Sequence, residues 1–587
     1  MTNDRPSNLG HRLIAAIIAG TALVIGASLT VNWLAARPDD VPLIRVKGDA
    51  QPSSRPATAP AVALPGNLFQ SWPANRKPDV ALILTGQQFS YLKFCGCSEK
   101  QLGGFERRFN FMAQLRERGW PIVALDLGDL VTRQPGGLHA QTLLKYETAM
   151  KALEVLGYSA IGLGENEYKL PLIEALSLFT LQKPNADPRV LAANLKDRVA
   201  KFPANAQESM IGDWLTAGGK DGVPKIGVAS LAGLMVTNAV TQFSSEFQFE
   251  DNGRILTGVL AAMDKANVDL KVLLYHGDID AAKILAGDPK LAANAPLVFR
   301  DKFDVILCLS AEEEPPAKPD IVGKTMIIRI GHRGRHVGVV GAYKTGKPER
   351  PYELHYQFVA MGEEYETEKP KEEGHKILKL LDEYAKQVKS QNFLAAMPRA
   401  AHPVQAAFPQ ANVAFVGSAR CQQCHPAEVA IWEKTKHSHA YEALTKKADK
   451  PKLRQYDPEC VVCHTVGYAN NNGYSDEVKT KHLLHVGCEN CHGPGSLHSA
   501  DKDNRAYYPH LSPWKSQPNE LLPTADKIAR GLDGLTKPEK DILLRVDQMC
   551  QKCHDTDNDP RFKFEKYWPV IVHGKSGGPK PGTKLVR

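Results

Sequence analysis

The 587-residue sequence lacks any block of lysine and arginine, and this absence limits the partners it can have. Its 73 basic and 65 acidic residues give a formal net charge of +8, but they are spread along the chain and form no basic stripe. Binding to nucleic acid requires a concentrated positive surface that neutralises phosphates. We therefore expect no nucleic-acid partner and interpret the lysines as solvated surface.

Methionine is almost missing from the last third of the chain, where cysteine is concentrated. After Ala411 the only methionine is Met549, whereas eight of the eleven cysteines lie in this part. The short apolar runs that are typical of strands also stop here. This third must therefore be built on a different structural principle from the rest.

The N-terminus carries the one long apolar run of the sequence. Leu13–Ala36 contains no charge and follows Arg5, His11 and Arg12. A spanning helix needs about 20 apolar residues, and the basic flank stays in the cytoplasm. We predict a signal-anchor at residues 1–37 that holds the protein on the periplasmic side of the inner membrane. The alternative is cleavage of this segment and secretion to the periplasm.

The rest of the chain is too long for one hydrophobic core and should form two or three domains. Residues 38–77 are rich in Pro, Ala and Ser and are predicted to be a flexible linker. In residues 78–360 short apolar runs alternate with helical stretches, which predicts a layered α/β domain. The predicted strands are 80–84, 122–127, 160–163, 226–231, 272–275, 305–309 and 326–330.

A third segment, residues 361–410, has apolar residues at helical spacing from Ile377 to Val388. This pattern predicts either a linker helix or a terminal helix that packs back onto the α/β domain.

Four Cys-x-x-Cys-His motifs lie in residues 411–587. Two cysteines three positions apart can add to the two vinyl groups of a haem, and the next histidine becomes the proximal iron ligand. With 11 cysteines and 19 histidines in the chain, four such motifs cannot arise by chance. A zinc site would not require histidine after each pair, and no strand precedes them as in a thioredoxin motif. We predict four covalently attached haem c groups, at Cys421/Cys424/His425, Cys460/Cys463/His464, Cys488/Cys491/His492 and Cys550/Cys553/His554.

The sixth iron ligand is predicted by elimination. Met549 is adjacent to Cys550 and badly placed to reach an iron, so histidine should be the distal ligand. This ligation places the reduction potentials low in the range that axial ligands can set. Seven histidines in this region belong to no motif: His437, His439, His482, His485, His498, His510 and His573.

The segments Ala419–Trp432, Gly487–His498 and Tyr567–Gly574 resemble the tetrahaem cytochrome c family that accepts electrons from hydroxylamine oxidoreductase. The resemblance covers residues 411–587 and implies a mainly α-helical domain packed around its haems. It implies that three haems have two histidine ligands and that one haem keeps an open position. The residues that it assigns as distal ligands are His439, His498 and His573, and the open haem is the one at Cys460 and Cys463.

Two positions are not settled by spacing. His437 competes with His439 as a distal ligand, and His485 is either a ligand or a residue packed beside Cys488.

A second resemblance covers residues 78–345. Gly103–Arg108, Val123–Asp129, Ala149–Tyr158 and Leu163–Glu167 are similar to the UshA or 5'-nucleotidase type of calcineurin-like metallophosphoesterase. The resemblance implies a layered α/β sandwich with a site for two metal ions that activate water.

The metal ligands of that family are largely missing from this sequence. The Asp-x-His motif falls on Gln87–Phe89, the Gly-Asn-His motif reads Gly164–Glu167, and the late Gly-His-x-His motif has become Cys308–Glu312. Only Asp129 and His276 correspond to ligands. We expect a vestigial site, no divalent metal in this domain and no hydrolysis, although Glu165 or Glu167 could help to hold one metal.

Cys95-Gly-Cys97 precedes the Gly103–Gly104 turn, in a segment similar to one in UshA-like redox proteins and selenoproteins. The pair is either a thiol/disulfide site that exchanges two electrons or an inert disulfide of an oxidising compartment. Cys308 lies in an apolar run and is predicted to be a buried core residue.

Together these features predict a membrane-tethered periplasmic electron-transfer protein with periplasmic or membrane-bound redox partners. Two alternatives stay open: an active metallophosphoesterase with a redox domain, and a haem oxidoreductase that acts on a small nitrogen or sulfur compound. Whether the chain is an enzyme does not follow from the sequence.

Overall fold

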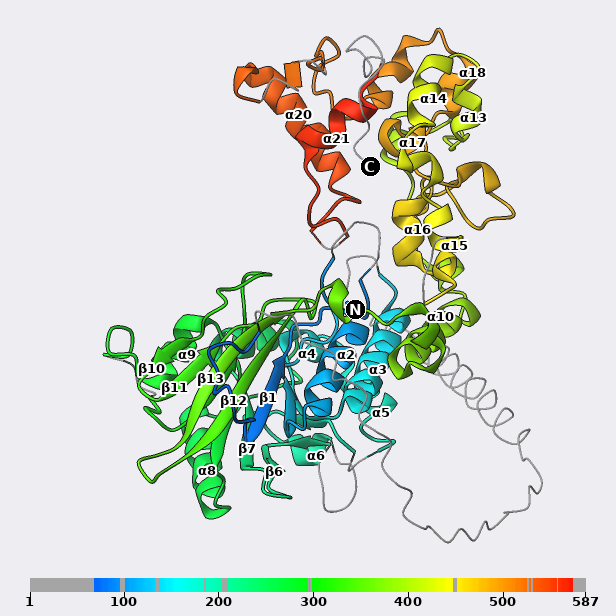
Figure 1. Ribbon diagram of the computed structural model, residues 1–587. Helices are drawn as coiled ribbons and strands as arrows, with labels where there is room; N and C mark the ends of the chain where they lie inside the picture. Colours follow the sequence, from blue (N-terminus) through cyan, green and yellow to red (C-terminus); the bar gives the residue numbers. More distant parts are fainter. Residues whose placement is uncertain are drawn as a thin grey trace, which may run out of the picture. The chain divides into compact units, whose positions relative to one another are not determined.

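The computed structural model describes most of the chain beyond the predicted linker (Figure 1). The described residues are 68–94, 101–132, 137–183, 186–202, 210–293, 295, 298–446, 451–524, 527–528, 532–556 and 558–573. The predicted signal-anchor, most of the predicted linker and the Cys95/Cys97 pair lie outside them. None of the helices in the described part is long and apolar enough to cross a membrane.

The first sheet has seven strands in the order β13-β12-β1-β2-β3-β4-β5. From β1 to β5 the neighbours are parallel, and the hairpin of β12 and β13 adds antiparallel strands beside β1. The strands are β1 (Val80–Thr85), β2 (Ile122–Asp126), β3 (Tyr158–Gly162), β4 (Arg189–Leu191), β5 (Ile211–Gly212), β12 (His336–Lys347) and β13 (Arg350–Ala360).

The second sheet has six strands in the order β10-β11-β9-β8-β7-β6. Its four central strands are parallel, and an antiparallel strand closes each edge. The strands are β6 (Trp214–Gly218), β7 (Lys225–Ala232), β8 (Leu270–His276), β9 (Val305–Cys308), β10 (Asp320–Val322) and β11 (Thr325–Ile328).

The two sheets pack face to face because their strands are apolar on both faces. In β1, Val80, Leu82 and Leu84 join a core between the sheets, while Ala81 and Ile83 join a core under the helices. Side chains alternate between the two faces of a strand, so a strand buried on both sides reads as a continuous apolar run. The layered α/β sandwich predicted from the sequence is confirmed.

Helices cover the outer face of each sheet (Figure 1). The helices α2, α3 and α5 pack on the first sheet, and α8 and α9 pack on the second. The helices of this region are α2 (Phe105–Glu117), α3 (His139–Leu156), α4 (Glu165–Tyr168), α5 (Leu172–Leu178), α6 (Arg198–Lys201), α7 (Leu234–Phe243), α8 (Asn252–Lys265) and α9 (Ile279–Ala286).

The helix predicted around Ile377–Val388 is α10 (Lys376–Ser390). Its apolar face, including Ile377, Leu378 and Leu381, belongs to the same core as α2 and α3. His375 caps its N-terminus by accepting a hydrogen bond from the backbone N–H of Leu378 at 3.3 Å. The helix therefore packs back onto the α/β region, which is one of the two predicted arrangements.

The C-terminal region contains short helices and, among its described residues, no strand. Its α-helices are α11 (Phe393–Ala396), α12 (Pro403–Ala407), α13 (Ser418–Cys421), α14 (Pro426–Trp432), α15 (Glu442–Thr445), α16 (Pro458–His464), α17 (Cys488–His492), α18 (Ser496–Ala500), α20 (Lys537–Cys550) and α21 (Phe564–Ile571). Its 3-10 helices are η3 (Lys436–His439), η4 (Arg454–Tyr456), η5 (Lys481–Leu483), η6 (Arg505–Leu511) and η7 (Leu532–Gly534), and η1 (Glu363–Tyr365) and η2 (Lys369–Gly374) precede α10. The predicted mainly helical class of this region is confirmed.

Candidate haem-binding and phosphoesterase-like sites

Each Cys-x-x-Cys-His motif is attached to a short helix. The helix α16 contains the second motif, α17 contains the third, and α13 and α20 end on the first cysteines of the first and fourth motifs. In the first motif the backbone N–H of His425 donates to the carbonyl of Cys421 at 2.9 Å, and His554 and Cys550 make the same contact at 3.0 Å. One helical turn thus separates the first cysteine from the histidine, which brings the reactive side chains to one side.

All eight motif cysteines are free thiols. Sulfur in this form can add to a vinyl group, whereas a disulfide cannot. The motif cysteines are therefore chemically suited to covalent haem attachment.

Three motif histidines each lie opposite a histidine from another part of the chain. An imidazole nitrogen binds a first-row metal at about 2.0–2.1 Å, so two rings on opposite sides of one ion have centroids roughly 6.3 Å apart. The observed separations fit an iron between the rings. The pairs are His425 with His498 at 6.3 Å, His437 with His554 at 5.9 Å, and His492 with His573 at 5.9 Å.

The residue opposite His554 is His437, whereas His439 lies elsewhere. The ring of His439 lies edge-on to His485 at 6.3 Å, and its Nδ1 is 3.6 Å from Glu442. The side chain of His439 is 60% exposed. Burial lowers the pKa of His437 to about 4, which keeps this ring neutral and able to bind a metal. The structure thus favours His437 where spacing alone left two candidates.

Several of these rings are oriented by a hydrogen bond at Nδ1. His464 and His492 contact the carbonyl oxygens of Ala440 and Leu511 at 2.6 and 2.7 Å. A carbonyl only accepts, so Nδ1 must carry the proton and Nε2 keeps its lone pair. His573 makes the same kind of contact with the carbonyl of Ile571 at 2.8 Å. The donor atom that iron requires is therefore exposed on the correct side of these rings.

The four motifs lie beside one another in an order that differs from their order in the chain. A hydrogen bond between Cys421 and Cys488 joins the first and third motifs, and one between Cys463 and Cys553 joins the second and fourth. Cys491 is close enough to Cys553 to raise its own pKa electrostatically. The order in space is first, third, fourth and second.

In the α/β region the two retained phosphoesterase residues lie at the carboxyl ends of parallel strands. Asp129 follows β2 and His276 ends β8. A Cβ on Gly162 would lie 2.6 Å from Nε2 of His276, and one on Gly164 would lie 2.4 Å from the carboxyl carbon of Asp129. The two glycines therefore leave room for both side chains at one edge of the sandwich, where ligands of layered α/β folds bind.

His276 is fully buried, and neither ring nitrogen has a hydrogen-bond partner. Burial lowers the pKa of His276 to about 3. A neutral imidazole with an unsatisfied nitrogen could accept a metal, but the described residues contain no group of three or more His, Cys, Asp or Glu that could hold one.

The residues that replace the missing ligands have structural contacts instead. The Gln87 amide joins the β1 end to Ser310, donating to its carbonyl at 3.1 Å and accepting from its N–H at 2.8 Å. Phe89 packs edge-on against His332. These contacts hold together the loops that would otherwise surround a metal pair.

Glu167 is a further structural residue. Its carboxylate accepts hydrogen bonds from the backbone N–H groups of Asp129, Leu130 and Gly164 at 2.7–2.9 Å. Burial and the neighbouring Asp129 raise the pKa of Glu167 to about 8. Asn166 donates to Asp129 through its backbone and side chain at 2.9 and 2.7 Å. The lone pairs that a metal would need are therefore already used by the protein.

Sequence reasoning missed the buried polar groups behind this edge. Arg108 is fully buried and donates to the Gln88 amide oxygen at 2.5 Å, and the Asp126 carboxylate accepts from Thr85 at 2.5 Å. Both lie in segments quoted for the phosphoesterase resemblance, but their burial cannot be inferred from the motif alone.

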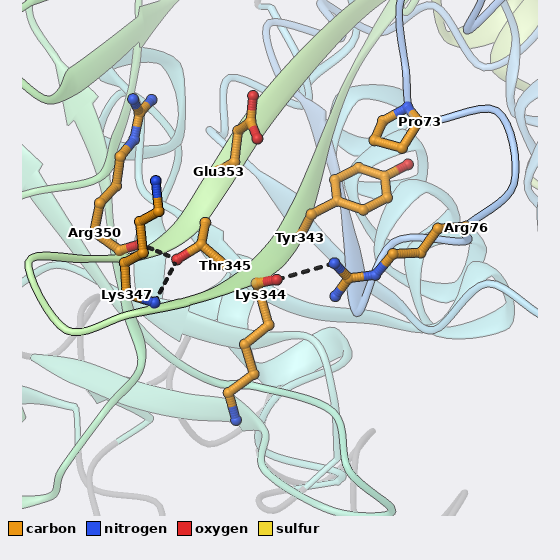
Figure 2. A pocket seen from close by; sticks show the side chains of 8 residues that line it. All are labelled: Pro73, Arg76, Tyr343, Lys344, Thr345, Lys347, Arg350 and Glu353. Atoms are coloured by element: carbon orange, nitrogen blue, oxygen red, sulfur yellow. Dashed lines mark hydrogen bonds between the residues drawn. The ribbon is translucent and has the colours of Figure 1, made fainter.

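The described cavity at the end of the β12–β13 hairpin contains none of the predicted site residues. It has a volume of about 430 Å³, and Arg76, Tyr343, Lys347 and Arg350 are among the residues that line it (Figure 2). Arg76 is paired with Asp79 at 2.6 Å. We assign no chemistry to this cavity.

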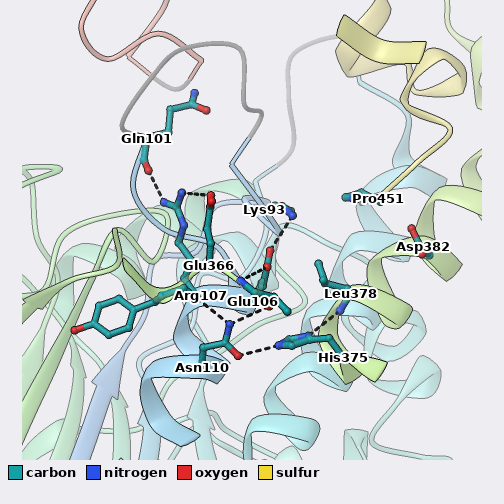
Figure 3. Close-up of polar contacts among 12 residues, drawn as sticks. Lys93, Gln101, Glu106, Arg107, Asn110, Glu366, His375, Leu378, Asp382 and Pro451 are labelled. Atoms are coloured by element: carbon teal, nitrogen blue, oxygen red, sulfur yellow. Dashed lines mark hydrogen bonds and ion pairs between the residues drawn. The ribbon is translucent and has the colours of Figure 1, made fainter. Parts of the chain in front are cut away.

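The helix α2 fixes the chain on both sides of the Cys95/Cys97 segment (Figure 3). Before it, Lys93 pairs with Glu106 at 2.8 Å, and after it the carbonyl of Gln101 accepts from Arg107. Burial by itself would raise the pKa of Glu106, but Lys93 and hydrogen bonds to Thr367 lower it. The Cys95/Cys97 prediction itself falls outside the described residues.

Contacts also join the α/β region to the haem motifs. Gln141 donates to Asp457 at 2.9 Å and to Tyr384 at 3.0 Å, and Lys145 pairs with Glu459 next to Cys460. After the fourth motif, Asn558 accepts from Gln101 at 2.7 Å. The second and fourth motifs therefore have direct polar contacts with the other region.

Cys308 is fully buried in β9, as predicted. Burial raises the pKa of its thiol to about 12, so it is an inert core residue.

Comparison with known proteins relates each region to a different family. Residues 420–493 match the family model described as cytochrome c554 and c-prime. Cytochrome c-554 of Nitrosomonas europaea is 30% identical over 156 residues, which cover 24% of this chain and 59% of that protein. The 5'-nucleotidase of Rattus norvegicus is 26% identical over 287 residues, or 48% of this chain and 47% of that protein.

Among solved structures, a 5'-nucleotidase precursor from Thermus thermophilus has 18% identity and a TM-score of 0.41, covering 55% of this chain and 60% of that one. The chain spans between about half and three fifths of the length of the curated relatives named here. It thus joins a region similar to 5'-nucleotidases to a C-terminal region that matches cytochrome c554 and carries the haem motifs.

Proposed function

We propose that the protein transfers electrons through four covalently attached haem c groups on the periplasmic side of the membrane. The observation that carries this proposal is the set of three histidine pairs at 5.9–6.3 Å, each containing one motif histidine. Haem iron would supply one-electron redox chemistry. The protein would contribute eight thiols for attachment, the histidine ligands and the close spacing of the motifs.

The ligand assignment follows from the pairs. His425 with His498, His492 with His573 and His554 with His437 would each hold one iron, and His437 takes the role that the sequence resemblance gave to His439. His464 would be the proximal ligand of the second haem, for which the resemblance implies an open position.

The haem number is tested by a pyridine haemochrome assay against protein mass. We expect four haems per chain, and a lower number in fully matured protein would contradict the proposal.

The ligand assignment is tested with His437→Ala and the matched variant His439→Ala. The first should convert one low-spin haem to high-spin in electron paramagnetic resonance, and the second should leave the spectrum unchanged. The reverse result would restore His439 as the ligand.

An open haem would also permit chemistry on a small nitrogen or sulfur compound. Cyanide or nitric oxide should then bind one haem of the four. If all four haems exclude both probes, the protein is an electron carrier alone.

For the α/β region we propose a scaffold that does not hydrolyse nucleotides. Gln87, Phe89 and Ser310 make structural contacts at the positions of missing ligands, and Glu167 is engaged by three backbone N–H groups. Assays with nucleotides and bis-phosphodiesters in the presence of Mn²⁺ or Zn²⁺ should show no enzymatic turnover. Metal-dependent turnover that Asp129→Asn abolishes would show the site to be active.

We further propose that Cys95 and Cys97 form a redox pair that exchanges electrons with the haems. The anchoring of Lys93 and Gln101 on α2, and the contact of Gln101 with Asn558 after the fourth motif, support this proposal. Replacing both cysteines with serine should slow haem reduction by a dithiol donor. Unchanged kinetics in a folded variant would make the pair an inert structural element.

Membrane tethering by residues 1–37 and redox partners in the periplasm or membrane remain part of the proposal. Fractionation of the full chain tests the tether, because salt-resistant membrane association is expected and recovery in the soluble periplasmic fraction would favour cleavage.

A further inference from the structure

The proximal histidine of the fourth motif is held by a different kind of partner from those of the second and third. Nδ1 of His464 and His492 lies near backbone carbonyls, whereas Nδ1 of His554 lies 2.8 Å from the Asp559 carboxylate. His425 is 4.0 Å from Glu428, beyond hydrogen-bonding distance, and its side chain is 53% exposed. A carboxylate bonded to a metal-ligating histidine makes that histidine a stronger donor.

Local contacts hold Asp559 in this position. Its backbone N–H donates to the carbonyl of Asp555 at 2.8 Å, and its own carbonyl accepts from Phe562 at 2.9 Å. The ring of Phe562 stacks on His554 with centroids 4.5 Å apart and an interplanar angle of 19°. The imidazole is therefore fixed at its edge by the carboxylate and on its face by an aromatic ring.

The carboxylate is only 17% exposed, so water screens its charge less than at the surface. The other charged groups near this motif are Asp555 and Lys552, which act on Cys553, and Asp555 is engaged by Asn558 at 2.7 and 3.0 Å. On the opposite side of the proposed iron position lies the neutral, buried His437. Asp559 is thus the carboxylate that acts directly on the ligand.

We propose that Asp559 is a positioning residue that lowers the reduction potential of the fourth haem below those of the other His–His haems. This inference rests on the proposed haem ligation. Ferric iron carries one more positive charge than ferrous iron, so a stronger donor and a nearby negative charge favour the ferric form.

The spatial order of the motifs gives this difference a role. The fourth haem would lie between the third and the second, so the haem that is hardest to reduce would separate the two ends of the group. Electrons would rest on the first and third haems or on the second, and would pass through the fourth without remaining there.

The test is a potentiometric titration of the holoprotein with Asp559→Asn, Asp559→Ala and Asp559→Glu. Asparagine can still accept the hydrogen bond but has no charge. A tenfold change in the reduction equilibrium of one haem is expected, which corresponds to about +59 mV in the lowest of the four components. Alanine should shift it at least as far, and glutamate should restore most of the parental value.

The matched control is Glu565→Gln, which removes an exposed carboxylate of α21 and should leave all four components unchanged. A lowest component that stays constant in Asp559→Asn, in protein with four low-spin-competent haems, would overturn the inference. Fewer than four haems, or no His–His signal in the parental protein, would instead contradict the proposed function.

Discussion

In the α/β region every residue of β1 is buried, whereas in the first haem motif Cys424 and His425 are exposed. The α/β region builds extended cores from its own Leu, Val, Ile and Phe side chains. The haem-motif region has only two small apolar clusters, one around Tyr468 and Val461 and one around Leu543 and Val546. A chain segment with so little apolar core needs covalent or metal-based support to fold. One region is therefore self-sufficient, and the other depends on its haems.

The strongest test of this contrast is to remove haem attachment altogether. With serine at all eight motif cysteines, the C-terminal region should lose its resistance to proteolysis, while the α/β region keeps its own. Limited proteolysis followed by mass spectrometry distinguishes the two. A haem-free chain that yields a stable fragment of residues 411–573 would show that the small clusters suffice.

The contrast also predicts that the vestigial edge contributes to stability. Glu167→Ala leaves three buried N–H groups without an acceptor and should lower the free energy of unfolding of the α/β region by about 3 kcal/mol. The matched control is Glu165→Ala, which loses only an i,i+4 pair with Lys169 and should cost a few tenths of a kcal/mol. Urea unfolding measures both, and equal losses would contradict the structural role of Glu167.

His276 should have the opposite effect. Its folded pKa of about 3 lies below the ordinary value of 6.5, so the unfolded chain binds the proton first and stability is lost as pH falls from about 6.5 to about 3. His276→Leu removes an unsatisfied imidazole and should stabilise the region by about 1 kcal/mol at pH 7. The difference should widen by about 2–3 kcal/mol at pH 4.5. A difference that is constant with pH would mean that His276 is not held neutral by burial.

The smallest effect concerns the contact between the two regions. A double-mutant cycle of Lys145→Met and Glu459→Gln should give a coupling free energy of about 0.5 kcal/mol, because Glu459 is 45% exposed and the pair is screened. The pair Lys151 and Glu147, on the same helix α3, provides a cycle with no partner in the haem-motif region. If unfolding of the two regions is coupled in neither cycle, the contact does not transmit stability.

The sequence predicted different features of the two regions well. In the α/β region the apolar runs predicted seven strands, for example Val80–Leu84 within β1, because burial on both faces leaves a continuous pattern. The hairpin of β12 and β13 was not predicted, since glycines and polar residues such as Gly338 and Gly341 interrupt the pattern. In the haem-motif region the motifs were recognisable, but helix packing was not.

The ligand at the fourth motif shows why spacing has a limit. His437 and His439 are two residues apart in the 3-10 helix η3, so both are near enough in sequence to be a ligand. Which ring faces His554 depends on side-chain direction, which the fold sets and the local sequence does not. The same holds for Asp559, whose contact with His554 has no motif of its own.

The neighbour order of the motifs has a consequence for the biosynthesis of the protein. The second motif contacts the fourth, and the fourth contacts the third, although the fourth is the last to leave the export channel. A chain interrupted anywhere before Cys550 would carry three attachment sites but no link between the second haem and the others. Only a completely exported and matured chain can therefore conduct from one end of the group to the other, so truncated products would not divert electrons.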